Sequence, residues 1–120
     1  MRKSEIKLTV TLDEQEVPEM LEWSASEKGG AAAEQTNAFA LFVWNDATGD
    51  IMPVNLWTGH MDKIELKKFY INIIGSLAER LAFATEDYDM ANDMEGLCRK
   101  MAERLMQEIK EANALEGNAG

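Results

Sequence analysis

Seven consecutive apolar residues, AFALFVW at Ala38–Trp44, constrain the fold of this chain more than any other stretch. We expect a β-strand here. Because alternate side chains of a strand point to opposite faces, both faces of this strand must be apolar. The polar segment 45–50 ends in a Gly-Asp pair, which is typical of a hairpin turn. A second strand is predicted at Ile51–Thr58, where Pro53 indicates an edge position or a bulge because it lacks an N–H group.

The alternation divides the side chains of this hairpin into two sets. One set is predicted to face the core: Phe39, Leu41, Val43, Met52, Val54 and Leu56. The other set is predicted to form a protein interface: Ala40, Phe42, Trp44, Ile51 and Trp57. An uncovered apolar patch usually marks an interface, and aromatic residues are typical interface anchors. The alternative is that a bulge, or the segment 26–35, covers the second set within the monomer.

The rest of the chain changes from strand periodicity to helix periodicity. Residues 5–12 alternate strictly between apolar and polar side chains, and residues 19–25 follow as a second strand. The segment 26–35, rich in glycine and alanine, is predicted to be a mobile connection. Asp62 and Glu65 match a capping box, which predicts a helix from there to about residue 84. A second helix is predicted from an apolar stripe over residues 90–109.

The element order β-β-β-β-α-α predicts the α+β class. We expect a four-stranded antiparallel sheet followed by two C-terminal helices packed on one face. A length of 120 residues suits one domain. Residues 1–112 are therefore predicted to form a single α+β domain, with a flexible C-terminal tail at residues 113–120.

The charge balance excludes several classes of partner. Acidic residues number 22 and basic residues 12, which gives a net charge of −10. We expect no nucleic-acid partner, because phosphates require a basic patch. We also expect no direct membrane insertion, because no segment approaches the roughly 20 apolar residues of a membrane helix. The single cysteine and the absence of an apolar run near the first residues predict a cytoplasmic protein.

Few residues offer catalytic or ligand chemistry. His60, the only histidine, is either a general base or, as we favour, a polar residue of the connection before the first helix. Cys98 lies within an apolar helical stripe, which favours a buried thiol over a nucleophile. The acidic run 86–89 lacks the glycine and the final glutamate of a calcium loop. We therefore predict no catalytic residues, no cofactor and no metal.

Methionines are frequent in the second predicted helix. Met90, Met94 and Met101 fall on its apolar stripe. Core filling is the favoured interpretation. The alternative is an adaptable binding surface, since methionine side chains repack around varied partners.

Several motifs resemble those of a known family. The opening KSEIKLTVTLDE…VPE…EWSA at Lys3–Ala25 is similar to that of the gliding motility protein GldC family of Bacteroidetes. The same holds for Val43-Trp44, for LWT at Leu56–Thr58 and for the segment Met61–Phe69. The similarity covers about residues 2–111. It implies a small soluble protein associated with the machinery that moves cells over surfaces, with no catalytic residues to transfer.

A looser similarity concerns the order of the elements. Strands followed by two helices, in a strongly acidic chain, are similar to the export chaperone SecB, which assembles through its sheets and binds unfolded clients. Our leading hypothesis is a non-enzymatic cytoplasmic accessory protein of gliding motility that acts through protein contacts and forms a homo-oligomer. The alternative is a SecB-like homo-oligomeric chaperone or export adaptor. A third hypothesis is a small-molecule-binding or catalytic domain centred on His60.

Overall fold

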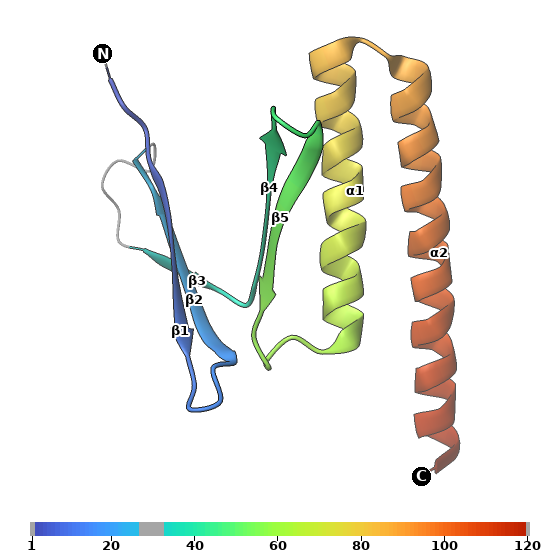
Figure 1. The fold of residues 1–120 in the computed structure, drawn as a ribbon. Helices are drawn as coiled ribbons and strands as arrows, with labels where there is room; N and C mark the ends of the chain where they lie inside the picture. Colours follow the sequence, from blue (N-terminus) through green and yellow to red (C-terminus); the bar gives the residue numbers. More distant parts are fainter. Residues whose placement is uncertain (1, 27–32, 120) are drawn as a thin grey trace. The chain divides into compact units, whose positions relative to one another are not determined.

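The structure is a computed structural model that describes residues 2–26 and 33–119. In it, the strands come first along the chain and the helices second (Figure 1). The chain divides into two compact units, Met1–Met61 and Asp62–Gly120. The first unit contains the strands, and the second contains the helices. The α+β class with two C-terminal helices is therefore confirmed. Packing of the helices on a sheet face, a single domain over 1–112 and the flexible tail stay predictions.

Five strands form two separate antiparallel sheets, rather than the single four-stranded sheet that was predicted. The first sheet has the order β1-β2-β3, and the second is the hairpin β4-β5. The strands are β1 (Ile6–Leu12), β2 (Pro18–Ala25), β3 (Glu34–Thr36), β4 (Ala38–Asn45) and β5 (Asp50–Trp57). The prediction of one sheet was wrong because it missed β3, which completes the first sheet on β2.

Strand β3 begins in the last two residues of the segment 26–35, which was predicted to be a connection, and ends at Thr36. Its three residues pair with β2, from Leu21 opposite Thr36 to Trp23 opposite Glu34. Residues 27–32 of that predicted connection lie outside the described residues. Leu21, which takes part in this pairing, is completely buried. A short polar strand of this kind is specified by its neighbour more than by its own side chains.

A sharp bend at Asn37 ends the first sheet and begins the second. Thr58, which follows β5, donates its backbone N–H to the Asn37 carbonyl at 2.9 Å and its hydroxyl to Asn37 Oδ1 at 3.0 Å. Thr36 supports the bend from the other side, because its hydroxyl donates to the Ala38 carbonyl at 3.2 Å. Thr58 is only 1% exposed, so its hydroxyl donates to Asn37 from a buried position.

Two long helices form an antiparallel hairpin in the second unit (Figure 1). They are α1 (Lys63–Thr85) and α2 (Tyr88–Ala119). Asp62 is the N-cap of α1, and its Oδ1 accepts from the Glu65 N–H at 2.8 Å, which confirms the predicted start. Glu86 ends α1 in the left-handed conformation, with φ of 58°.

Small residues allow α1 and α2 to approach closely. Ala78 on α1 and Ala91 on α2 are buried, as is Leu105 further along α2. A Cβ added at Gly75 would lie 3.5 Å from the Cys98 sulfur, which is ordinary contact distance. The Cys98 thiol donates to the Ile71 carbonyl at 3.3 Å, which ties the two helices together. Of the predicted apolar stripe on the second helix, Leu105 is buried in the seam between the two helices, whereas Met90 and Leu97 are exposed.

The Asn37–Thr58 contact predicts a clear stability effect. Replacing Thr58 by valine keeps the shape of the side chain and leaves Asn37 Oδ1 without its donor. We expect the free energy of unfolding of the strand unit to fall by about 1–3 kcal/mol. Urea unfolding followed by tryptophan emission measures this unit, because all three tryptophans lie within it.

The matched control is Thr48→Val, in the exposed turn between β4 and β5. We expect this variant to change the free energy of unfolding by less than about 0.5 kcal/mol. Equal unfolding midpoints for the two variants would show that the buried contact does not stabilise the bend.

Candidate protein interface

The predicted interface residues lie on one face of the β4–β5 hairpin. In the register of the two strands, Trp44 is opposite Ile51. Ala40 and Phe42 alternate with Trp44 along β4, so their side chains share its face. Trp57 lies opposite Ala38, at the other end of the same face. We call the surface of Ala40, Phe42, Trp44, Ile51 and Trp57 the aromatic face.

The large side chains of the aromatic face are exposed. Their exposed fractions are as follows: Phe42 45%, Trp44 62%, Ile51 50% and Trp57 46%. Ala40, in the middle of the face, is half-buried. Covering one aromatic side chain of this kind is worth about 1.5–3 kcal/mol. The geometry therefore offers a partner several apolar anchors on one surface, and the role of this face as an interface stays a prediction.

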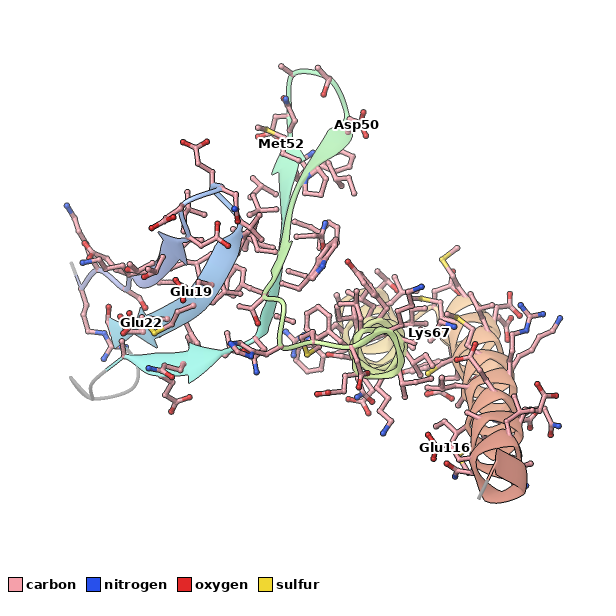
Figure 2. The ribbon with its side chains drawn as sticks, turned by 90° about the horizontal axis from the view of Figure 1, so that it is seen from below. Glu19, Glu22, Asp50, Met52, Lys67 and Glu116 are labelled. Atoms are coloured by element: carbon pink, nitrogen blue, oxygen red, sulfur yellow. The ribbon has the colours of Figure 1, made fainter. Side chains whose placement is uncertain are left out.

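The opposite face of the hairpin was predicted to be core, and the structure exposes much of it. Leu41, Val43, Met52 and Val54 are all exposed, whereas Phe39 and Leu56 are half-buried. The exposed positions lie toward the turn, and Figure 2 shows Met52 and Asp50 at that end of the hairpin. The prediction was wrong for these four residues because it assumed one sheet, in which further strands and helices would cover this face.

The turn of the hairpin is built by local polar contacts. The Gly49 N–H donates to the Asn45 carbonyl at 2.9 Å, and Gly49 has φ of 68°, which favours glycine. Asn45 Oδ1 also accepts from the Ala47 N–H at 3.0 Å. These contacts close the hairpin between Asn45 and Asp50, as predicted, and they hold Trp44 and Ile51 opposite each other.

One polar group in the hairpin is buried without compensation. Asn55 lies opposite Ala40, in the middle row of the aromatic face. Its Oδ1 atom is buried and accepts no hydrogen bond from the described residues. An unpaired buried carbonyl oxygen costs about 1–3 kcal/mol. The sequence analysis missed this residue, and its only signal was a polar amide among apolar neighbours.

His60 lines an open cleft of the first unit. The cleft has a volume of about 640 Å³, and its lining includes Glu19, Gln35, Asn37 and His60. The His60 backbone N–H donates to the Thr58 hydroxyl at 3.3 Å. Among the described residues, its imidazole makes no hydrogen bond to a serine, a cysteine or a carboxylate. The predicted role of His60 as a polar connecting residue stays a prediction.

The helix methionines divide between the seam and the surface. Met94 and Met101 are half-buried, whereas Met90 is exposed. Met101 lines an apolar groove between α1 and α2 with Tyr70 and Leu105. At the entrance of this groove, Lys67 forms an ion pair with Glu108 at 2.6 Å. Both side chains of this pair are substantially exposed, so it stabilises the helix pair only weakly.

The described residues contain neither a metal-binding cluster nor a membrane-spanning helix. In the described part of the chain, no group of three or more His, Cys, Asp or Glu side chains has the arrangement of a metal site. In the acidic run 86–89, Asp87 Oδ1 accepts from the Met90 N–H at 3.0 Å, so this carboxylate caps α2. None of the described helices is both long and apolar enough to cross a membrane.

These features define a small α+β protein whose largest exposed apolar element is a β-hairpin. The chain belongs to the GldC-like family, because the model of that family, described as gliding motility-associated protein GldC-like, matches residues 18–107. The predicted resemblance is thereby confirmed, although the motif within β1 lies before the matched range. No match was found among curated proteins or among solved structures.

The unpaired amide of Asn55 predicts that apolar replacement stabilises the strand unit. We expect Asn55→Leu to raise the free energy of unfolding by about 1 kcal/mol, because it removes a buried acceptor that has no donor. Urea unfolding followed by tryptophan emission is the measurement. Gln35→Leu, at an exposed strand position, is the control and should change the value by less than about 0.5 kcal/mol. A lower unfolding midpoint for Asn55→Leu would mean that its amide is satisfied.

Proposed function

We propose that this protein is a non-enzymatic accessory component of bacterial gliding motility that works in the cytoplasm through protein contacts. Membership of the GldC-like family supports the association with motility. The exposed aromatic face is the observation that carries the proposed mode of action. We further propose that the chain self-associates through the same hairpin.

The aromatic face has the composition of a binding surface. It contains two tryptophans, which are common hot-spot residues, and a phenylalanine. It carries no charged side chain, so a partner gains apolar burial without desolvating an ion. A protein partner with an apolar patch fits this surface best.

A capture experiment tests the proposed contact. Tagged protein is expressed in cells of the source organism and recovered with its bound partners, for the wild-type chain and for Trp44→Ala and Trp57→Ala. We expect both variants to lose the same partner, because removal of a hot-spot side chain costs 2 kcal/mol or more, roughly 30-fold in affinity. Circular dichroism verifies that both variants fold.

Phe83→Ala is the matched control, since Phe83 is an exposed aromatic residue on α1 rather than on the hairpin. We expect this variant to retain the partner. Retention of every partner by both tryptophan variants would refute the aromatic face as the binding surface.

A SecB-like chaperone or export adaptor is the second candidate. The exposure of both hairpin faces favours it, because a holdase needs a broad apolar surface for unfolded chains. The discriminating measurement is light scattering of several unrelated unfolding proteins with and without an equimolar amount of this chain. A motility accessory protein is expected to leave their aggregation unchanged. Suppression for all of them, lost in Trp44→Ala, would favour the chaperone function instead.

A further inference from the structure

One strand edge in this fold lacks the usual protection against pairing. Among the described strands with an open edge, β1 carries Lys7, β3 is only three residues long and includes Glu34, and β5 contains Pro53. Charges, prolines and short lengths are the common devices that keep strand edges from pairing. Strand β4, Ala38–Asn45, has eight residues with no charge and no proline, and its register with β5 is continuous.

The hydrogen bonds of the hairpin show which backbone groups of β4 point outward. The Thr58 N–H donates to the Asn37 carbonyl, so this pair is hydrogen-bonded, and antiparallel pairs alternate between bonded and non-bonded along the strands. The pair of Phe42 and Pro53 is then non-bonded, as a residue without an N–H requires. The N–H and C=O groups of Ala40, Phe42 and Trp44 therefore face away from β5, and they make no hydrogen bond to the described residues.

We propose that β4 pairs with β4 of a second copy of this chain, antiparallel and centred on Phe42. In this register Phe42 lies opposite Phe42 of the second copy, and Ala40 lies opposite Trp44 in both directions. Each such pair exchanges two backbone hydrogen bonds, so every outward group of these three residues is satisfied. The product is a two-fold symmetric sheet of four strands with the order β5-β4-β4-β5.

The side chains match this register as well as the backbone does. The small Ala40 opposite the large Trp44 leaves room for the indole ring, and symmetry repeats this fit on the other side. The two Phe42 rings meet at the symmetry axis as a cross-strand aromatic pair, which is favourable. The two neighbouring symmetric registers fit less well. A shift of one residue toward the turn places two large side chains, Phe42 and Trp44, opposite each other. A shift the other way requires Ala38, whose backbone is already hydrogen-bonded to the Thr36 hydroxyl.

The distribution of charge also favours pairing at the edge of β4. Each chain carries a net charge of −10, so two copies repel each other over most of their surfaces. Symmetric pairing places identical side chains near each other, which brings like charges together on a charged strand. Strand β4 avoids this cost because it contains no ionisable side chain. Pairing through β4 also adds strands to the β4–β5 sheet, and an isolated two-stranded hairpin gains stability from additional strands.

A charge exchange at Phe42 tests the register directly. We expect the full-length wild-type chain to be a dimer in sedimentation equilibrium. Phe42→Lys and Phe42→Glu each place like charges at the symmetry axis, and each is expected to raise the dimer dissociation constant at least about 30-fold. An equimolar mixture of the two variants places opposite charges there and is expected to form the heterodimer.

Val54→Lys is the matched control, because Val54 has a similar exposure but lies on β5 and outside the aromatic face. We expect this variant to remain dimeric. A monomeric wild-type chain, a mixture that stays monomeric, or a Val54→Lys variant that dissociates as much as Phe42→Lys would each overturn the proposal.

A second pair of variants keeps the test valid if charged side chains unfold the hairpin. In a Cys98→Ser background, Phe42→Cys brings two cysteines together across a bonded pair, where Cα atoms lie about 5.5 Å apart and within disulfide range. We expect mild oxidation to join the two copies of this variant by a disulfide between their cysteines at position 42. Met52→Cys, exposed on β5, is expected to stay unlinked. Failure of Phe42→Cys to link while the protein is dimeric would overturn the register.

The proposal rests on the proposed function in one respect, since both use the β4–β5 hairpin. The two have different readouts. A dimer that captures no motility partner would count against the function alone. A monomer that loses its partner on Trp44→Ala would count against self-pairing alone.

Discussion

The contact between Asn37 and Thr58 is the constraint on which the strand unit depends. It joins residues 21 positions apart, and it does so with two hydrogen bonds from Thr58, whose side chain is buried. It closes the open end of the β4–β5 hairpin, and it also sets the bend at which the chain leaves the first sheet. Because it defines one bonded pair, it fixes the alternation of bonded pairs along the whole hairpin. The identity of the outward backbone groups on β4 follows from this single contact.

Local signals in the sequence were sufficient for most elements. Alternation predicted β1, the continuous apolar run predicted β4, and Asp62 with Glu65 predicted the start of α1. The division into two sheets could not be predicted in this way. Strand β3 has no apolar alternation, and the bend at Asn37 depends on Thr58, which is distant in the chain. Long-range polar pairing leaves no periodic signature, so one sheet was the simpler and incorrect interpretation.

The candidate site was also predictable only in part, because its shared face depends on local alternation whereas its exposure depends on distant parts of the chain. The side chains of the aromatic face share a face because of strand alternation alone, which the sequence contains. Its exposure depends on what covers the hairpin, and the sequence predicted one face as core that is exposed in the structure. Asn55 was missed because a buried acceptor without a donor is visible only when its surroundings are known. Single polar residues within apolar strands therefore merit as much scrutiny as the aromatic residues around them.

The proposed self-pairing and the proposed partner binding use different directions of the same residues. Backbone N–H and C=O groups of β4 lie in the plane of the sheet, whereas the side chains of Phe42 and Trp44 project from its face. In the antiparallel pairing centred on Phe42, directly opposite residues share a face, so the aromatic faces of two copies form one continuous surface. Self-association then enlarges the surface offered to a partner instead of burying it. A two-fold partner would engage both halves at once, and its affinity would rise by the effective concentration of the second contact.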